Sequence, residues 1–173
     1  MGGNIIKFPG DVTTPTADLT TAKLIFNSVL STKNEKLLCA NISNFYLKNP
    51  MGGYEYMKLP LEIIPDEMIQ KYKLQYLAHK GVLYMETQKG MYGLSQAGKI
   101  ANDKLKLHME KFGYEPAPIT PDLWRHQTRP LQISLVVDDF GVKYERQSDI
   151  TYLPDALNTI YKISVDWDGK IYC

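Results

Sequence analysis

Residues 135–144 read LVVDDFGVKY, two apolar runs on either side of a pair of adjacent acids. β-Branched and aromatic residues flank Asp138 and Asp139, and this pattern predicts a β-hairpin with the acids at its tip. Two carboxylates at an exposed tip suit a divalent metal, because Mg²⁺ is commonly held by one or two carboxylates together with substrate phosphates and water. Such a site supports phosphoryl or nucleotidyl transfer. An acidic turn without a metal is the alternative, since acids are common in turns.

The composition is that of an ordinary globular chain of 173 residues, which is long enough for one domain with a core. The net charge is +1, so any binding of nucleic acid must come from a local groove. No apolar stretch approaches the roughly 20 residues of a membrane span, and the first residues lack a secretion signal. Cys39 and Cys173 make no disulfide framework, and the histidines (His79, His108 and His126) are scattered. We expect an intracellular protein, cytoplasmic or nuclear, with no membrane contact.

Helices and strands are mixed along the chain. Apolar residues recur at helical spacing for about four turns after Thr14-Pro15, which predicts a first helix. A second helix is expected to begin with Ser95 as its cap and to run to about Phe112, where Gly113 closes it. Because strict βαβ alternation is missing, the pattern predicts an α+β fold. The other expected elements are a helix that opens at 65–67, a helix at 154–161, and strands at 37–43, 82–87, 131–138, 140–145, 163–166 and 170–172.

Two further segments combine with the hairpin. Residues 41–47, NISNFYL, end an expected buried strand, and residues 89–98, KGMYGLSQAG, form a glycine-rich turn before a helix. Together with two shorter matches, these three segments resemble the reverse transcriptases of copia-type LTR retrotransposons. The resemblance covers about residues 37–145. The first motif lies at 41–47, and YEYMKLP at 54–60 matches the family pattern eIYM-x-x-P. KGMYGLSQA at 89–97 matches the YGL-x-QA segment, and GY at 113–114 with DLW at 122–124 forms the fourth motif. VVDD at 136–139 matches YVDD, with Val136 in place of a common aromatic.

This resemblance implies a polymerase palm, an antiparallel sheet that carries the acids and is backed by helices, with part of the fingers and without the thumb. It implies RNA-directed DNA synthesis, in which two Mg²⁺ ions, or Mn²⁺ in their place, bridge the primer 3′-hydroxyl and the dNTP. Both ends of the chain look cut, so residues 1–173 are expected to be a single truncated palm and fingers domain. Without basic clamps, its binding of primer-template is expected to be weak and strongly salt-dependent.

The resemblance also implies roles for single residues. Asp138 and Asp139 correspond to the paired metal-binding acids of the family. Tyr46 falls where an aromatic packs under the sugar and excludes a 2′-hydroxyl; ordinary core packing is the alternative. Gln96, Ala97 and Gly98 correspond to a turn that contacts nucleotide or template, and small residues there allow close approach to the backbone. A helix start whose glycine only relieves packing is the alternative for that turn.

The chain departs from the family at Asn41, where the first motif has an aspartate that bridges both metals. An amide has no net charge, offers one oxygen ligand and turns a donor nitrogen toward a cation. Loss of that carboxylate should cost roughly 10²–10⁴ in rate or more. We therefore predict a copy that is inactive or nearly so, whether by natural decay or by design. The alternative function is a non-catalytic, palm-like structural module that self-associates through surfaces where fingers and thumb would pack. A nucleic-acid-binding domain without polymerase activity is a third candidate, which the charge balance disfavours.

Overall fold

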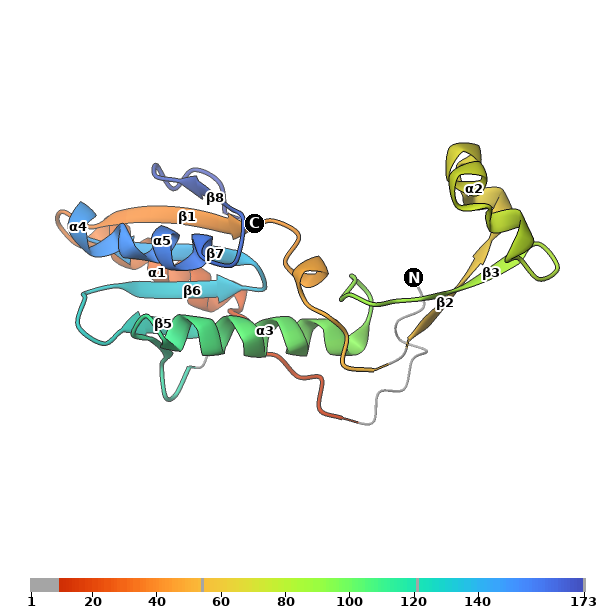
Figure 1. The fold of residues 1–173 in the computed structure, drawn as a ribbon. Helices are drawn as coiled ribbons and strands as arrows, with labels where there is room; N and C mark the ends of the chain where they lie inside the picture. The colour runs from red at the N-terminus through yellow and green to blue at the C-terminus, as the bar shows by residue number, and fades with distance from the viewer. Residues whose placement is uncertain (1–9, 54, 121, 173) are drawn as a thin grey trace.

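A six-stranded antiparallel sheet forms the centre of the structure, with the strands in the order β4-β5-β6-β7-β1-β8 (Figure 1). The structure is a computed structural model that describes residues 10–53, 55–120 and 122–172. Tyr54 of the YEYMKLP motif, Cys173 and the start of the glycine-rich N-terminal segment lie outside the described residues. Sheet and helices together confirm the predicted α+β class with an antiparallel sheet. The strands are β1 (Lys36–Ile42), β2 (Tyr56–Pro60), β3 (Val82–Glu86), β4 (Tyr114–Pro116), β5 (Leu123–His126), β6 (Gln132–Val136), β7 (Asp139–Tyr144) and β8 (Ile163–Asp166).

Helices cover both faces of this sheet (Figure 1). On one face, α3 (Ser95–Glu110), α4 (Gln147–Ile150) and α5 (Tyr152–Asn158) enclose the main core. On the other face, α1 (Leu19–Ser31) lies against β6 and β7. None of the helices in the described part of the chain combines the length and the hydrophobicity that a membrane crossing needs.

The core follows from alternation along the strands. Leu38, Ala40 and Ile42 of β1 are at most 5% exposed and face α3 and α5. The residues between them face α1 and the C-terminal segment, because successive side chains of a strand point to opposite faces. Leu105 of α3 is fully buried against the same core, and its truncation to alanine would cost about 2–5 kcal/mol. The acid-bearing hairpin is thus held on a well-packed support.

The ends of two predicted helices differ from the structure. The first helix begins at Leu19 rather than at Thr14-Pro15, because the Asp18 carboxylate caps it by accepting from the Thr21 amide at 2.6 Å. The second helix takes Leu94 rather than Ser95 as its N-cap position, and it ends at Glu110, so Phe112 leaves the inner face and is 41% exposed.

The expected strand at 170–172 is absent from the described residues. Instead, the Asp166 carboxylate accepts backbone N–H groups from Asp168, Lys170 and Ile171 at 2.7–3.0 Å and folds the segment into a loop. Lys170 also forms an ion pair with Asp168 at 2.6 Å. A side chain that satisfies three backbone donors therefore replaces the ladder hydrogen bonds that a strand would make.

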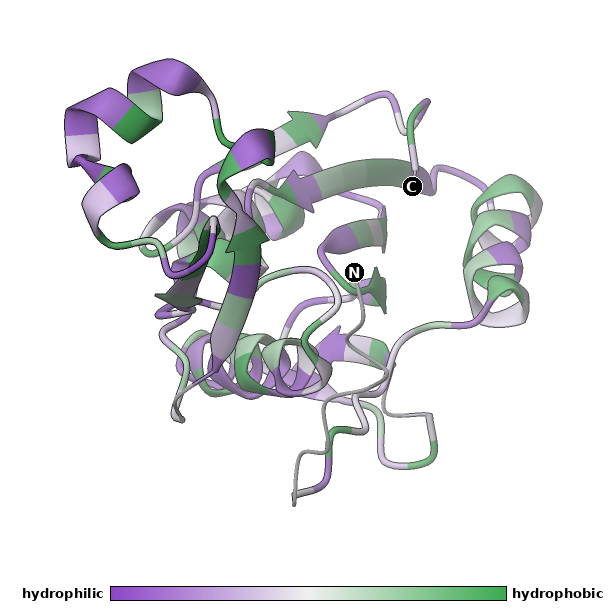
Figure 2. Cartoon of the chain, turned by 90° about the vertical axis from the view of Figure 1, so that its right-hand side faces the viewer, coloured by the Kyte–Doolittle hydropathy of each residue, from purple (hydrophilic) through white to green (hydrophobic). Residues whose placement is uncertain are grey.

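An arm projects from the body between β1 and α3 (Figure 1). We use this name for residues 56–86, in which β2 and β3 pair from Tyr56↔Glu86 to Pro60↔Val82. The β2–β3 pair is connected through α2 (Asp66–Tyr72) and two short 3-10 turns. α2 begins at the Pro-Asp-Glu start that the sequence predicts. Polar and apolar stretches are mixed along the arm (Figure 2).

Candidate functional site

The acidic hairpin joins β6 to β7 through a two-residue turn. Val136 pairs with Asp139, so Val137 and Asp138 form the turn and Asp139 is the first residue of β7. The predicted hairpin is confirmed, but only Asp138 sits at the tip. Val137 has φ 56°, a left-handed conformation that is strained for a β-branched residue. Tight two-residue hairpins require positive φ at the first turn position, which is why glycine is usual there.

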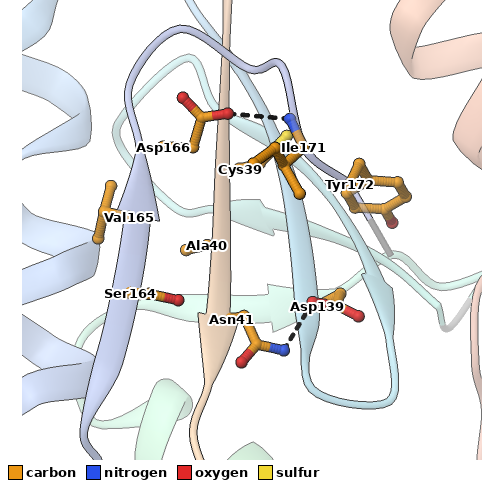
Figure 3. A pocket seen from close by; sticks show the side chains of 9 residues that line it. All are labelled: Cys39, Ala40, Asn41, Asp139, Ser164, Val165, Asp166, Ile171 and Tyr172. Carbon is orange, nitrogen blue, oxygen red and sulfur yellow. Dashed lines mark hydrogen bonds between the residues drawn. The ribbon is translucent and has the colours of Figure 1, made fainter.

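The first-motif position lies beside the second acid. In the β1–β7 ladder Asn41 is the direct partner of Asp139, and cross-strand partners share a face of the sheet. The Asn41 Nδ2 donates to Asp139 Oδ1 at 2.7 Å (Figure 3). The backbone continues the contact, since the Ile42 amide donates to the Asp138 carbonyl at 2.9 Å. Two motifs separated by 98 residues in the chain thereby meet at one end of the sheet.

The surroundings of Asp138 disfavour the ionised form of its carboxyl group. Burial raises its pKa, and the neighbouring Asp139 carboxylate raises it further. Hydrogen bonds from the backbone, from Asn41 and from the Tyr92 hydroxyl act in the opposite direction. A divalent cation between the two carboxylates would relieve both the burial cost and the repulsion.

Two aromatic side chains border the acids. The rings of Tyr46 and Tyr92 meet edge to face with centroids 4.7 Å apart. Burial is the main cause that raises the pKa of both phenols, and the charge of Asp138 raises it further. Tyr46 is half-buried, whereas Tyr92 is 56% exposed. The predicted sugar-contacting tyrosine is therefore brought to the acid pair together with a second tyrosine that the sequence reasoning did not single out.

The glycine-rich turn wraps around Tyr46. A Cβ on Gly90 would lie 2.8 Å from the Tyr46 carbonyl oxygen, so a side chain there would force a shift. A Cβ on Gly98 would meet only ordinary contacts, the nearest at 3.9 Å, although Gly98 also faces the Tyr46 hydroxyl. The tightest packing against Tyr46 in this turn is thus at Gly90, which belongs to the same motif but was not selected, and the close approach of nucleic acid at Gly98 stays a prediction.

The remaining residues of that turn point inward. Gln96 is 3% exposed and Ala97 is 1% exposed. The Gln96 Nε2 donates to Glu55 Oε1 at 2.7 Å, and its own Oε1 is buried without a partner among the described residues. Contacts of Gln96 and Ala97 with nucleotide or template stay predictions. Glu55, which orients the Gln96 amide, is a site residue that only tertiary structure reveals.

A cavity of about 440 Å³ opens beside Asn41 and Asp139 on the face of the sheet toward α1 (Figure 3). Small side chains leave space for it on this face, because Ser164 is the cross-strand partner of Asn41 and Gly141 lies opposite Cys39. At its far side the Tyr172 hydroxyl lies 3.0 Å from Ser134 Oγ. Its lining residues are Cys39, Ala40, Asn41, Asp139, Ser164, Val165, Asp166, Ile171 and Tyr172.

The donor set fits a single divalent cation better than a pair. Asp138 and Asp139 offer two carboxylates, but the Nδ2 of Asn41 occupies one oxygen of Asp139. Within residues 10–53, 55–120 and 122–172 no group of three or more His, Cys, Asp or Glu side chains is arranged to hold a metal ion. A third carboxylate that bridges two ions is what this arrangement lacks.

Comparison of the chain with protein-family models, with curated proteins and with solved structures gave no match. The functional assignment below therefore depends on the motifs of the sequence and on the geometry of this site.

Proposed function

We propose that this chain is the palm, with part of the fingers, of an RNA-directed DNA polymerase of the copia type, impaired in catalysis by Asn41. One observation carries the proposal: Asn41 and Asp139, from the first and last motifs, face each other on adjacent strands at 2.7 Å. An unrelated α+β domain would have no reason to bring these two motifs together. The approach of Tyr46 and Tyr92 to Asp138 supports the same assignment.

The residues divide the work of nucleotidyl transfer. Asp138 and Asp139 would hold the divalent cation, Mg²⁺ or Mn²⁺, which supplies charge neutralisation at the transferring phosphoryl group. Tyr46, anchored by the turn at Gly90, would form the wall that the sugar of the dNTP meets. Such transfer depends mainly on positioning and electrostatics, so a rigid sheet edge that carries the acids is the right support.

Asn41 explains why activity should be low. Its amide donates to Asp139 and so occupies a carboxylate oxygen that would otherwise be free to ligate metal. The chain keeps the support, the acid pair and the aromatic wall, and lacks the third negative charge. Binding of primer-template is expected to be weak at the net charge of +1.

A second candidate function is a non-catalytic module that self-associates. The arm favours it, because large apolar side chains are exposed along the whole arm. Large apolar side chains exposed together on one projecting element are typical of a protein interface. The most exposed of these side chains are Tyr56, Ile63, Tyr76, Leu77 and Tyr84, at 62–80%.

Primer extension with Mg²⁺ and with Mn²⁺ tests the leading proposal. The proteins are this chain, its Asn41→Asp variant, and that variant joined to the fingers and thumb segments of an active copia-type enzyme. Incorporation that appears with the restored carboxylate and is lost again in Asp139→Asn supports the proposal. No incorporation even in the extended Asn41→Asp protein refutes it. Sedimentation at micromolar concentration tests the alternative, which a monomer would contradict.

A further inference from the structure

Strand β3 forms an outer edge of the arm (Figure 1). In the described part of the chain the arm is a two-stranded sheet, so β3 has β2 on one side only. The Thr87 amide donates to the Glu55 carbonyl at 2.7 Å, and this bond fixes which residues of β3 turn their backbone groups toward β2. Because these directions alternate along a strand, the N–H and C=O groups of Tyr84 and Glu86 point outward.

The open part of this edge is short. Val82 also points outward, but it exchanges backbone hydrogen bonds with His79 at 2.9 and 3.1 Å. Beyond β3, the Gln88 carbonyl accepts from the Met51 amide at 3.0 Å. Along this side of the arm the open backbone groups therefore belong to residues 84–86, and all three residues are exposed.

We infer that this edge binds the same edge of a second copy of the chain, antiparallel and centred on Met85, to form a symmetric dimer. In this register Tyr84 lies opposite Glu86 of the second copy, and each such pair exchanges two hydrogen bonds. A register centred on Tyr84 instead would need the groups of Val82 that His79 already holds. The inference does not depend on the polymerase proposal, and it gives the second candidate function a defined surface.

The methionines on one face of the arm favour this register. Met57 is the cross-strand partner of Met85, which is 42% exposed. At the dimer axis Met85 meets Met85 of the second copy as a non-hydrogen-bonded pair, in which side chains approach most closely. The two copies together form a continuous row of methionines across the sheet. Such flexible, polarisable side chains pack readily against their own kind.

The opposite face of the arm is complementary in charge to a second copy of itself. Lys58 is the cross-strand partner of Tyr84, and Tyr56 is that of Glu86. In the dimer each row across the sheet therefore holds one lysine, one glutamate and two tyrosines. The two glutamates lie in different rows, so like charges do not face each other directly.

The β2 edge of the arm is protected against such pairing. Its open segment carries the exposed charge of Lys58, and the strand ends at Pro60, which has no N–H to donate. Lysine and proline are typical of sheet edges that resist association. The open segment of β3 carries neither. Pairing of β3 with β3 closes on itself as a dimer, whereas pairing of β3 with β2 would continue into an open chain of copies.

Sedimentation velocity of the full chain, from low to high micromolar concentration, tests the dimer. The paired edge is small, so we expect dimers mainly at the upper end of this range. Tyr84→Pro removes a donor that each copy gives to the other, and it should weaken dimerisation by about tenfold or more. Tyr56→Pro is the matched control, because Tyr56 is 64% exposed against 65% for Tyr84 and also turns its N–H outward. Proline at either position removes no bond of the β2–β3 ladder, and Tyr56→Pro should dimerise like the unchanged chain.

Disulfide trapping tests the register without a proline. In a Cys173→Ser background, Met85→Cys places a thiol at the axis, where the Cα atoms of a non-hydrogen-bonded pair lie about 4.5 Å apart, within the reach of a disulfide. Leu77→Cys is the control, because Leu77 is 70% exposed on the same arm and would react more readily in random collisions. We expect mild oxidation to join Met85→Cys chains into dimers and to leave Leu77→Cys chains monomeric.

The outcomes separate this inference from the functions proposed above. A dimer that survives Tyr84→Pro, or equal trapping at the two cysteines, overturns the paired edge and leaves self-association by another surface standing. A monomer over the whole concentration range overturns the paired edge together with the second candidate function. Growth beyond the dimer overturns the closed register. The polymerase proposal stands or falls separately, on primer extension by the Asn41→Asp proteins.

Discussion

Replacement of Asn41 by aspartate should destabilise the chain when divalent cations are absent and should make its stability depend on them. The Asn41 amide now donates to Asp139 Oδ1 at 2.7 Å. In the variant that hydrogen bond is lost, and a carboxylate faces a carboxylate at nearly the same distance. Asp138 lies next to both, so three acids would share one corner of the sheet.

The size of the effect follows from this geometry. Two unit charges 4 Å apart interact by about 4 kcal/mol at an effective dielectric constant of about 20. Because the pair is only half-buried, solvent should reduce the repulsion to about half of that, and loss of the hydrogen bond adds about 1 kcal/mol. The expected total is about 2–3 kcal/mol, or a fall in melting temperature of about 5–10 °C for a chain of this length. Mg²⁺ at about a hundred times its Kd would restore about 2.7 kcal/mol.

Thermal and urea unfolding in EDTA and in Mg²⁺ measure both parts. Asn44→Asp is the matched control, because Asn44 is an exposed asparagine with the same change of charge three positions away. The double variant Asn41→Asp with Asp139→Asn exchanges the two side chains and restores one amide beside one carboxylate. It should regain most of the lost stability in EDTA and should respond little to Mg²⁺.

The reasoning fails if Asn41→Asp and Asn44→Asp unfold alike in EDTA and respond alike to Mg²⁺. It also fails if the exchanged pair is as unstable as the single variant, since the loss would then not come from the meeting of two carboxylates.

Three further predictions concern the same sheet and its edge. Gly141→Ala should cost about 1–3 kcal/mol in urea unfolding, because its Cβ would lie 2.8 Å from Ser134 Oγ, whereas Gly52→Ala meets nothing within 4 Å and should be neutral. Asp138→Asn should stabilise the fold at neutral pH by up to about 1 kcal/mol, since the raised pKa means that folding disfavours the ionised form. That gain should vanish below pH 3.8, where the carboxyl is protonated in both states. Burial and the nearby positive charge of Arg129 lower the pKa of His126, so the folded state favours the neutral imidazole. The stability that this gives is complete above pH 6.5 and should be lost as the pH falls below that value. The free energy of unfolding of His126→Asn should lack this pH dependence.

The sequence predicted the elements whose signals are local. The hairpin at 132–144, β1 and α3 follow from alternation, from a buried apolar run and from helical spacing, and their bounds differ from expectation by a few residues. The strands β4 and β5 were missed, because three or four residues are too few to show a period. β5 pairs with β6 and β4 pairs with β5, so the position of each is set by its neighbouring strand rather than by its own pattern.

The site could be predicted only where chemistry and chain order coincide. Asp138, Asp139 and Asn41 were found because carboxylates are conspicuous and the motifs occur in a familiar order. Glu55 was missed because its contact with Gln96 depends on how the arm leaves the sheet. Ser164 and Tyr92 are equally invisible in the sequence, since β8 register and the fold of the turn at 90–94 bring them to the acids.

The conformation and charge of the hairpin tip support the proposal that its acids bind a ligand. Val137 is held at φ 56°, and a non-glycine residue in the left-handed region costs about 1–2 kcal/mol. At the next position Asp138 is partly buried beside another acid, which folding alone also disfavours. A tip selected for packing or self-association would gain stability from glycine and a neutral residue at these two positions. Strain and like charge at consecutive residues therefore support the proposed cation site, and the amide of Asn41 removes part of the repulsion that a bound cation would otherwise offset.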